Sequence, residues 1–315
     1  MPLVSVIIPT IHRPELVRRA IASVTVQSLR DLEIIVVIDG RDRATVDVLD
    51  KLDEPRLRVV QNPSSLGPGR ARNAGAEIAS GEWLAFLDDD DEWLPNKLER
   101  QLVGRTAADA VLVTCRCRVE NVDGVHIWPR RLYDSRQSVD EYLFGRKSPM
   151  RGDVYFATPT FLLPAWLFAK TRFGETCQDE DTTLLLRVTK KCGGRIEMLP
   201  DALVVVHEKS NESSESQATW KKCLAWPDDV ADMISRRSYS GYCLVILGSR
   251  AARSWDLRAI PVLLDRAFRM GSPSTLQLIL FASFWLVPPY LRRRLRLGMY
   301  WLRRTVKPVT SNALC

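Results

Sequence analysis

Four short apolar runs in the first 87 residues constrain the fold more than any other feature of this sequence. They lie at residues 3–9, 32–38, 57–61 and 82–87, and each has the length and composition of a strand. Helical patterns separate them: Pro14 suits the first turn of a helix, and an alanine-rich stretch follows the Gly/Pro-rich turn at 64–69. Strands that alternate with helices predict a parallel α/β sheet.

Carboxylates follow two of these predicted strands directly. Asp39 ends the second run, and residues 88–91, all aspartates, end the fourth. Ligands of open α/β sheets bind beyond the carboxyl ends of the strands. We therefore expect Asp39 and the aspartate run to belong to one site.

The four aspartates need something to offset their mutual repulsion, which is roughly 1 kcal/mol per neighbouring pair in water and several-fold larger in a partly dry cleft. Apolar neighbours, Phe86 before the run and Trp93 after it, argue against a purely solvated loop. A helix formed by DEWLPNKLERQL would favour one or two of the carboxylates by about 0.3–1 kcal/mol each. A calcium loop is excluded because its sixth position must be glycine and Trp93 stands there. Oxygen ligands that hold Mg²⁺ or Mn²⁺ against a diphosphate are the sharper hypothesis.

Several motifs in order along residues 3–210 resemble those of the family 2 inverting glycosyltransferases. They are VSVIIPT, the SVxxQS pattern at 23–28, EIIVVID, GxxxARNxG, GEWLAFLDDDDEW and an ED pair before LLLR. The resemblance covers about two thirds of the chain. It implies a GT-A fold, a nucleotide-sugar donor, a divalent metal and inversion at the anomeric carbon.

The resemblance also implies roles for individual residues. Asp181, in the ED pair, matches the general base. Asp90 matches the metal-diphosphate contact, and His207 resembles a histidine that can approach the metal. The residues implied to bind the nucleotide sugar, most often a UDP-sugar, are Pro9, Thr10, Asp39, Arg70, Arg72, Asn73, Asp88 and Asp89.

Each of these roles has a plainer alternative. Glu180 and Asp181 could cap a helix, His207 could be held by an ordinary hydrogen bond, and Arg70 and Arg72 could be solvated charges. The four aromatic residues that could either stack on an acceptor sugar or pack in the core are Trp128, Tyr133, Tyr155 and Phe156.

The C-terminal third predicts helices and a local positive charge. Residues 292–307 hold seven Lys and Arg and no acid, which equals the net charge of +7, so the rest of the chain is neutral and gives no reason to propose a nucleic acid partner. The apolar run at 274–287 is too short to span a bilayer. With its arginines and aromatics, the segment 276–304 fits an interfacial helix on anionic lipid, or a core helix with a basic tail.

These observations predict an α/β GT-A fold with three parts. Residues 1–110 would bind the nucleotide sugar, residues 111–215 would form a mixed acceptor-side half, and residues 216–315 would be helical. Seven cysteines without a CxxC pair and an N-terminus without a basic leader fit reduced thiols and a cytoplasmic protein, peripheral on the inner face of the membrane.

Metal-dependent, inverting sugar transfer to a glycan or lipid-linked acceptor in polysaccharide biosynthesis is the function we favour. The alternatives are an inactive scaffold that binds nucleotide sugar or membrane, which would not need a base, and a sugar nucleotidyltransferase. The latter would want a glycine-rich loop after the first strand, and VIIPTIHRPELV has no glycine.

Overall fold

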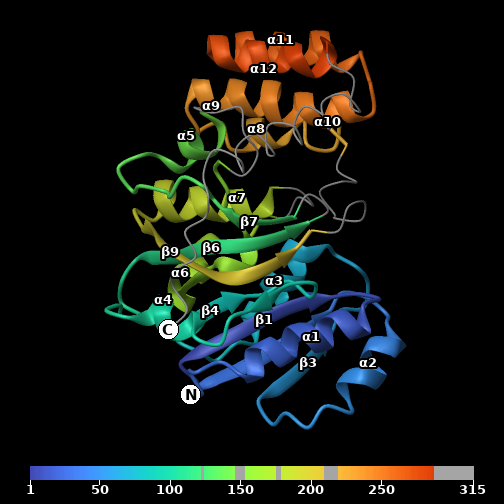
Figure 1. Ribbon diagram of the computed structural model, residues 1–315, viewed down its shortest axis with the longest axis vertical. Helices are drawn as coiled ribbons and strands as arrows, with labels where there is room; N and C mark the ends of the chain where they lie inside the picture. Colours follow the sequence, from blue (N-terminus) through green and yellow to red (C-terminus); the bar gives the residue numbers. More distant parts are fainter. Residues whose placement is uncertain (122–123, 146–152, 175–178, 209–218, 287–315) are drawn as a thin grey trace.

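A computed structural model describes residues 1–121, 124–145, 153–174, 179–208 and 219–286. Figure 1 shows α1 and α2 at one end of the molecule, the sheet across its middle, and a stack of C-terminal helices at the other end. The strands are β1 (Val4–Thr10), β2 (Leu32–Ile38), β3 (Leu57–Gln61), β4 (Trp83–Phe86), β5 (Glu92–Trp93), β6 (Val111–Asn121), β7 (Gly124–Trp128), β8 (Leu162–Pro164) and β9 (Arg195–His207). The helices of the α/β part are α1 (Pro14–Thr25), α2 (Arg43–Leu49), α3 (Pro68–Glu77), α4 (Lys97–Leu102), α5 (Val139–Phe144), α6 (Ala165–Thr171) and α7 (Glu180–Leu186).

The first half of the sheet is parallel, in the order β3-β2-β1-β4. Both faces of β1 and β2 are buried, so these strands are apolar without alternation. One face packs on α1 and the other on α3. Gly75 allows the close approach of α3, because a Cβ there would lie 2.7 Å from a methyl carbon of Ile7.

The second half of the sheet is mixed. β8 is antiparallel to β4 and β6, whereas β9 runs parallel to β6 along most of its length. The short strand β5 is antiparallel to β9 and brings the chain back immediately after the aspartate run. Trp93 is buried there, and its indole N–H donates to the carbonyl of Pro159 at 2.8 Å.

Helices are the regular elements of the described part of the C-terminal region, residues 219–286 (Figure 1). They are α8 (Trp226–Asp229), α9 (Arg236–Gly241), a π-helical segment (Tyr242–Leu247), α10 (Gly248–Arg253), α11 (Ala259–Arg269) and α12 (Thr275–Leu286). α9, the π-helical segment and α10 follow one another without a break, and we call residues 236–253 the C-terminal rod. In the part of the chain described, no helix combines the length and apolar character needed to cross a membrane.

The predicted fold class is confirmed: an α/β sheet with a mixed extension and a helical C-terminal region. All four predicted strands are present within one residue or so of their expected bounds. One expectation differs, because no helix starts directly after the aspartates. Glu92 and Trp93 pair with β9 instead, and α4 begins only at Lys97. The boundaries at 110 and 215 remain predictions, and residues 287–304 of the basic segment lie outside the described residues.

Candidate active site

The carboxyl ends of β2, β1 and β4 lie side by side, as the strand order requires. Thr10 sits between the two acidic strand ends and contacts both. Its carbonyl accepts a hydrogen bond from the backbone N–H of Asp39 at 2.8 Å, and its hydroxyl donates to Asp89 at 2.8 Å. The predicted grouping of Thr10, Asp39 and the aspartate run is therefore present. Pro9, the residue before Thr10, is buried in β1.

Burial alternates along the four aspartates, which form a turn closed by a hydrogen bond from the Asp91 N–H to the Asp88 carbonyl at 3.1 Å. The side chains of Asp88 and Asp90 are 29% and 35% exposed. Asp89 and Asp91 are buried. Two carboxylates can thus meet a ligand while the other two hold the loop in place.

Arginine side chains offset the repulsion within the run. Arg72 of α3 donates to Asp88. Arg13, just before α1, bridges Asp89 and Asp90 at 3.0 and 3.2 Å. Arg19 of α1 donates to the backbone carbonyl of Asp90 and lies 3.4 Å from Glu92. Arginine side chains, and not the start of a helix, therefore offset the repulsion among the aspartates, because the next helix starts six residues after Asp91.

The buried aspartates have raised pKa values. Burial raises the pKa of Asp89 to about 6, against the lowering effect of the Thr10 hydroxyl and Arg13. Burial, with the charges of Asp88 and Asp90, raises the pKa of Asp91 well above its ordinary value. The carboxylate of Asp91 accepts the backbone N–H of His207 at 3.1 Å, which links the loop to the end of β9.

Asp88 and Asp90 suit the expected Mg²⁺ or Mn²⁺ only together with a phosphate. Within the described ranges, no three His, Cys, Asp or Glu side chains are arranged to hold a metal ion. Mg²⁺ in particular is usually bound by one or two carboxylates plus substrate phosphates. The two solvent-reaching carboxylates fit that donor set.

His207 lies between two glutamates. Its Nε2 is 2.7 Å from Glu92 and its Nδ1 is 3.7 Å from Glu120. These contacts correspond to the plainer alternative, a hydrogen-bonded histidine. Its metal role stays a prediction, and would require the ring to exchange Glu92 for the cation.

Asp39 organises the loop that precedes α3. Its carboxylate accepts hydrogen bonds from the side chains of Asn62 and Ser65 and from the backbone N–H groups of Leu66 and Gly67, all between 2.8 and 3.0 Å. Its role in binding the nucleotide sugar remains a prediction. The observed contacts show that Asp39 also fixes the turn that starts α3.

Arg72 joins the aspartate run to α7. It is buried, and besides Asp88 it contacts Glu180 at 3.3 Å, on the first turn of α7. Burial lowers the pKa of Arg72, but the carboxylates of Asp88, Glu180 and Asp181 raise it above its ordinary value. The predicted base, Asp181, is the next residue, half-buried, and accepts the N–H of Thr182 at 2.6 Å.

Two other residues predicted to bind the nucleotide sugar, Arg70 and Asn73, differ in their surroundings. Arg70 is exposed on the first turn of α3. Asn73 exchanges two hydrogen bonds with the backbone of Phe173, at 3.1 and 3.3 Å. Asn73 therefore ties α3 to the segment ahead of α7, and its contact with the nucleotide sugar stays a prediction.

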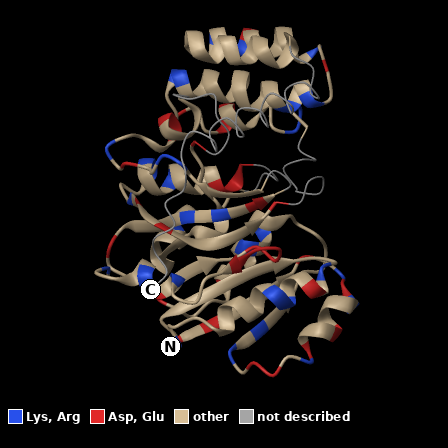
Figure 2. Cartoon of the chain, viewed as in Figure 1, with Lys and Arg blue, Asp and Glu red and all other residues tan. Residues whose placement is uncertain are grey.

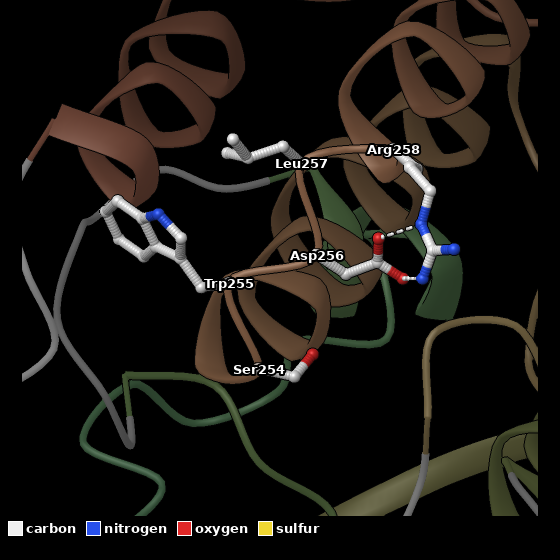
Figure 3. A pocket seen from close by; sticks show the side chains of 5 residues that line it. All are labelled: Ser254, Trp255, Asp256, Leu257 and Arg258. Carbon is white, nitrogen blue, oxygen red and sulfur yellow. Dashed lines mark hydrogen bonds and ion pairs between the residues drawn. The ribbon is translucent and has the colours of Figure 1, made fainter.

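Packing accounts for most of the aromatic residues left open by the sequence. Trp128, Tyr133 and Phe156 are buried, and Tyr155 meets the Trp128 ring edge-on. A pocket elsewhere, at the turn between α10 and α11, is lined by residues 254–258 and contains no predicted site residue (Figure 3).

Sequence reasoning missed Arg13, Arg19 and Glu180 as members of this site. A search for counter-charges would have indicated the two arginines, because HRPELVRR follows the first strand directly and strand ends of a parallel sheet meet at one edge. No local signal indicates that Glu180 pairs with Arg72, which lies 108 residues earlier in the chain.

The chain is similar to known proteins over much of its length. Residues 5–167, just over half of the chain, match the family described as "Glycosyl transferase family 2". The succinoglycan biosynthesis protein ExoO of Rhizobium meliloti (strain 1021) is 27% identical over 222 residues, which cover 68% of this chain and 63% of ExoO.

Two further similarities concern part of the sequence and the fold. The GalNAc(5)-diNAcBac-PP-undecaprenol beta-1,3-glucosyltransferase of Campylobacter jejuni is 43% identical over 101 residues, 31% of this chain and 33% of that enzyme. The chain thus spans less than two thirds of the length of either relative. The crystal structure of S. aureus TarS 1-349 in complex with UDP-GlcNAc superposes with a TM-score of 0.57 at 19% identity, covering 84% of this chain and 79% of that one.

Proposed function

The chain belongs to glycosyl transferase family 2, and from that premise we propose that it transfers a sugar from a nucleotide sugar to a hydroxyl group of a glycan or lipid-linked acceptor, with inversion. The observation that carries the proposal is the contact of buried Arg72 with both Asp88 and Glu180. It places the acidic strand end and the start of α7 on either side of one guanidinium. A donor site and a base would have to be neighbours in this way.

Asp181 is the proposed base. An acceptor hydroxyl is a poor nucleophile near neutral pH, and a carboxylate within hydrogen-bond reach can take its proton as the new bond forms. The pair formed by Arg72 and Glu180 fixes the first turn of α7, so Asp181 keeps its orientation while the donor is bound. Transfer in one displacement would invert the anomeric carbon.

Asp88 and Asp90 are the proposed contacts for the donor's ribose and diphosphate. When bound at Asp90, Mg²⁺ or Mn²⁺ would supply Lewis-acid stabilisation of the leaving diphosphate. Arg13 bridges Asp89 and Asp90, and its side chain is 40% exposed, so it lies next to the position at which the diphosphate would bind. A UDP-sugar is the favoured donor, supported by the UDP-GlcNAc in the TarS complex.

A lipid-linked acceptor is supported by the C-terminal region and by the undecaprenol-linked substrate in the name of the Campylobacter relative. The outer stripe of α12 is Thr275, Ile279, Ala282 and Leu286, with Ile279 60% and Leu286 80% exposed. α12 carries no charge, and Figure 2 shows few charges on the helices at this end of the molecule. Trp255 and Leu257 also point outward from their turn (Figure 3).

We therefore propose peripheral membrane contact through this apolar stripe and the basic segment that follows it. Gln277 and Phe281 on the opposite face of α12 are buried, so removal of the whole helix would disturb the fold. The test replaces Ile279 and Leu286 by serine, and separately Arg292, Arg293 and Arg294 by glutamine. Both variants should sediment less with vesicles of anionic lipid than the unaltered chain; equal sedimentation of all three would contradict the proposal.

The first experiment on the function itself is calorimetric titration of UDP, GDP and dTDP into the protein, with Mn²⁺ and with EDTA. We expect one nucleotide, UDP, to bind tightly and only with the metal, and Asp90→Ala to weaken that binding. Turnover is then followed as release of UDP from UDP-sugars in the presence of a polyprenyl-diphosphate-linked glycan, whose hydroxyl takes the sugar as UDP leaves. A folded protein that binds none of the nucleotides would overturn the proposal, and tight binding without any release of UDP would favour an inactive scaffold.

A further inference from the structure

Helix α7 is held at its N-terminus by the C-terminal rod. Asp179, the residue before the helix, has φ of 58°, a left-handed conformation that few non-glycine residues adopt. Its Oδ2 accepts a hydrogen bond from the Tyr242 hydroxyl at 2.5 Å and one from Arg250 at 3.4 Å. Both partners lie more than sixty residues later in the chain.

A second contact joins α7 to α8 of the C-terminal region through Thr183. The indole N–H of Trp226 donates to the Thr183 hydroxyl at 2.9 Å, and that hydroxyl donates to the Asp179 carbonyl at 3.0 Å. The rings of Trp226 and Tyr242 pack with centroids 4.5 Å apart. The first turn of α7 is thus fixed by two aromatic donors that support each other.

These groups are shielded from water. Tyr242 and Trp226 are buried, and the side chains of Asp179 and Arg250 are 13% and 10% exposed. Burial and the charge of Asp179 raise the pKa of Tyr242 well above its ordinary value, so the hydroxyl stays protonated and able to donate at neutral pH. A buried ion pair contributes little net stability but fixes geometry when its hydrogen bonds are satisfied.

The three consecutive acids at the start of α7 therefore have separate partners. Asp179 contacts the rod, Glu180 contacts Arg72, and Asp181 follows them. Asp179 lies just outside the helix, and its carbonyl accepts the backbone N–H of Thr183 at 3.0 Å, the hydrogen bond that closes the first turn. A fixed position of Asp179 therefore fixes the turn that carries Asp181.

We propose that Tyr242 and Arg250, acting through Asp179, are positioning residues that orient Asp181 toward the acceptor hydroxyl. The proposal rests on the role of Asp181 in the proposed function. It gives the helical C-terminal region a part in the reaction that is separate from membrane contact. Neither Tyr242 nor Arg250 needs to touch the donor.

The C-terminal region contains a matched control. Tyr239 lies on the same rod, is buried, and donates to Asp228 at 2.6 Å, while Arg266 contacts the same carboxylate at 2.7 Å. This Tyr-Asp-Arg group has the chemistry of Tyr242, Asp179 and Arg250 but makes no contact with α7 through that carboxylate. Tyr242→Phe and Tyr239→Phe each delete one hydroxyl and leave the ring.

The experiment compares the two variants in release of UDP from the UDP-sugar that the wild-type protein turns over, with thermal unfolding as a check of folding. We expect Tyr242→Phe to lower kcat on the order of 10-fold with KM for the donor and UDP binding unchanged, as a misoriented base predicts. Tyr239→Phe should stay within about two-fold of wild type. Asp179→Asn, which tolerates the left-handed backbone and can still accept from Tyr242, should retain more activity than Asp179→Ala.

Amide hydrogen exchange of residues 180–186 separates the failure of this inference from failure of the proposed function. Faster exchange in Tyr242→Phe than in Tyr239→Phe supports the positioning of α7. Equal exchange, or equal kcat in the two variants, would overturn it while leaving the function of Asp181 intact. A wild-type protein that binds UDP but releases none from any UDP-sugar would overturn the proposed function. The contact of Tyr242 and Arg250 with Asp179 would then have no role in catalysis.

Discussion

The molecule contains two runs of consecutive acids, 88–91 and 179–181. The repulsion between neighbouring carboxylates is offset differently in each. The first forms a turn after a strand, and its side chains alternate between solvent and interior. Its counter-charges, Arg13, Arg19 and Arg72, all come from the α/β half that contains it. The second starts a helix, so its side chains point in different directions, and its partners come from two different parts of the chain.

The difference indicates what each run can do. Alternation leaves two carboxylates of one face available to a common ligand, which suits a binding site. In the second run the side chains point in different directions and reach different partners, which suits a place where two regions of the chain meet. Arg72 contacts one acid of each run, so changes at this residue test the comparison most directly.

Arg72→Met should have the largest effect. It leaves Asp88 and Glu180 without their shared cation, and loss of one partner of a buried ion pair costs about 3–5 kcal/mol in the free energy of unfolding. Urea denaturation measures the loss, and UDP release should fall with it. Arg100→Met is the control: its pair with Asp201 is largely exposed, so a cost of at most about 1 kcal/mol is expected. Equal losses of unfolding free energy in Arg72→Met and Arg100→Met would show that Arg72 does not connect the two acidic runs.

Asp181→Asn should remove activity without removing stability. A general base contributes about 10²- to 10⁴-fold in rate, and the amide keeps the size and the acceptor oxygen that Thr182 uses. We expect kcat to fall by that factor while UDP affinity and the unfolding midpoint stay close to wild type. Loss of UDP binding in a folded Asp181→Asn protein would argue against its assignment as the base.

Arg13→Gln should have an intermediate effect, confined to the first run. Asp89 and Asp90 lose the cation that bridges them, at a cost of about 1–2 kcal/mol given the partial exposure of the guanidinium. Denaturant unfolding measures this cost. Arg18→Gln, on the neighbouring α1 and paired only with exposed Glu15 in the contacts described, should change stability by a few tenths of a kcal/mol. A loss no greater than that in Arg13→Gln would mean that water alone screens the aspartates.

The smallest effect is expected from the pH dependence of Asp89. Its pKa is about 6 in the folded protein and near 4 when unfolded, so between these values the native state holds a proton that the unfolded chain does not. The free energy of unfolding therefore gains about 1 kcal/mol from this group as the pH falls from 7 to 5. Asp89→Asn should lack that gain. Parallel stability curves for the two proteins over this range would contradict the raised pKa.

Glu33 does not interfere with this measurement. Hydrogen bonds from Ser5, Ser80 and Arg58 lower its pKa to about 2 despite burial, so its contribution to the free energy of unfolding is lost only below pH 5.

The parallel half of the fold could be predicted because its signals are local. Buried strands such as 32–38 are continuous apolar runs, and the strand order brings their acidic ends together. The mixed half lacks such signals: β6 and β9 pair in parallel although about eighty residues separate them, and β5 has only two residues. Those pairings depend on tertiary contacts that no short window contains.

The candidate site was predictable to the same extent. Asp39, Asp88 and Asp90 could be grouped because they stand at strand ends, whereas Asp181 was assigned because the ED pair before LLLR matches a motif of the family. The partners of these acids could not be found in that way. Tyr242 and Arg250 lie in a helical region with nothing to distinguish them from other buried or charged residues until the chain is folded.

The double contact of Arg72 also has an evolutionary consequence. A lysine at this position has one ammonium group and cannot serve two carboxylates with the fixed fork of a guanidinium. Loss of Arg72 would leave Asp88 and Glu180 without their shared counter-charge, and loss of either acid would leave a hydrogen-bond donor of the buried guanidinium without its acceptor. Among relatives of this chain, the three should therefore be retained together or replaced together.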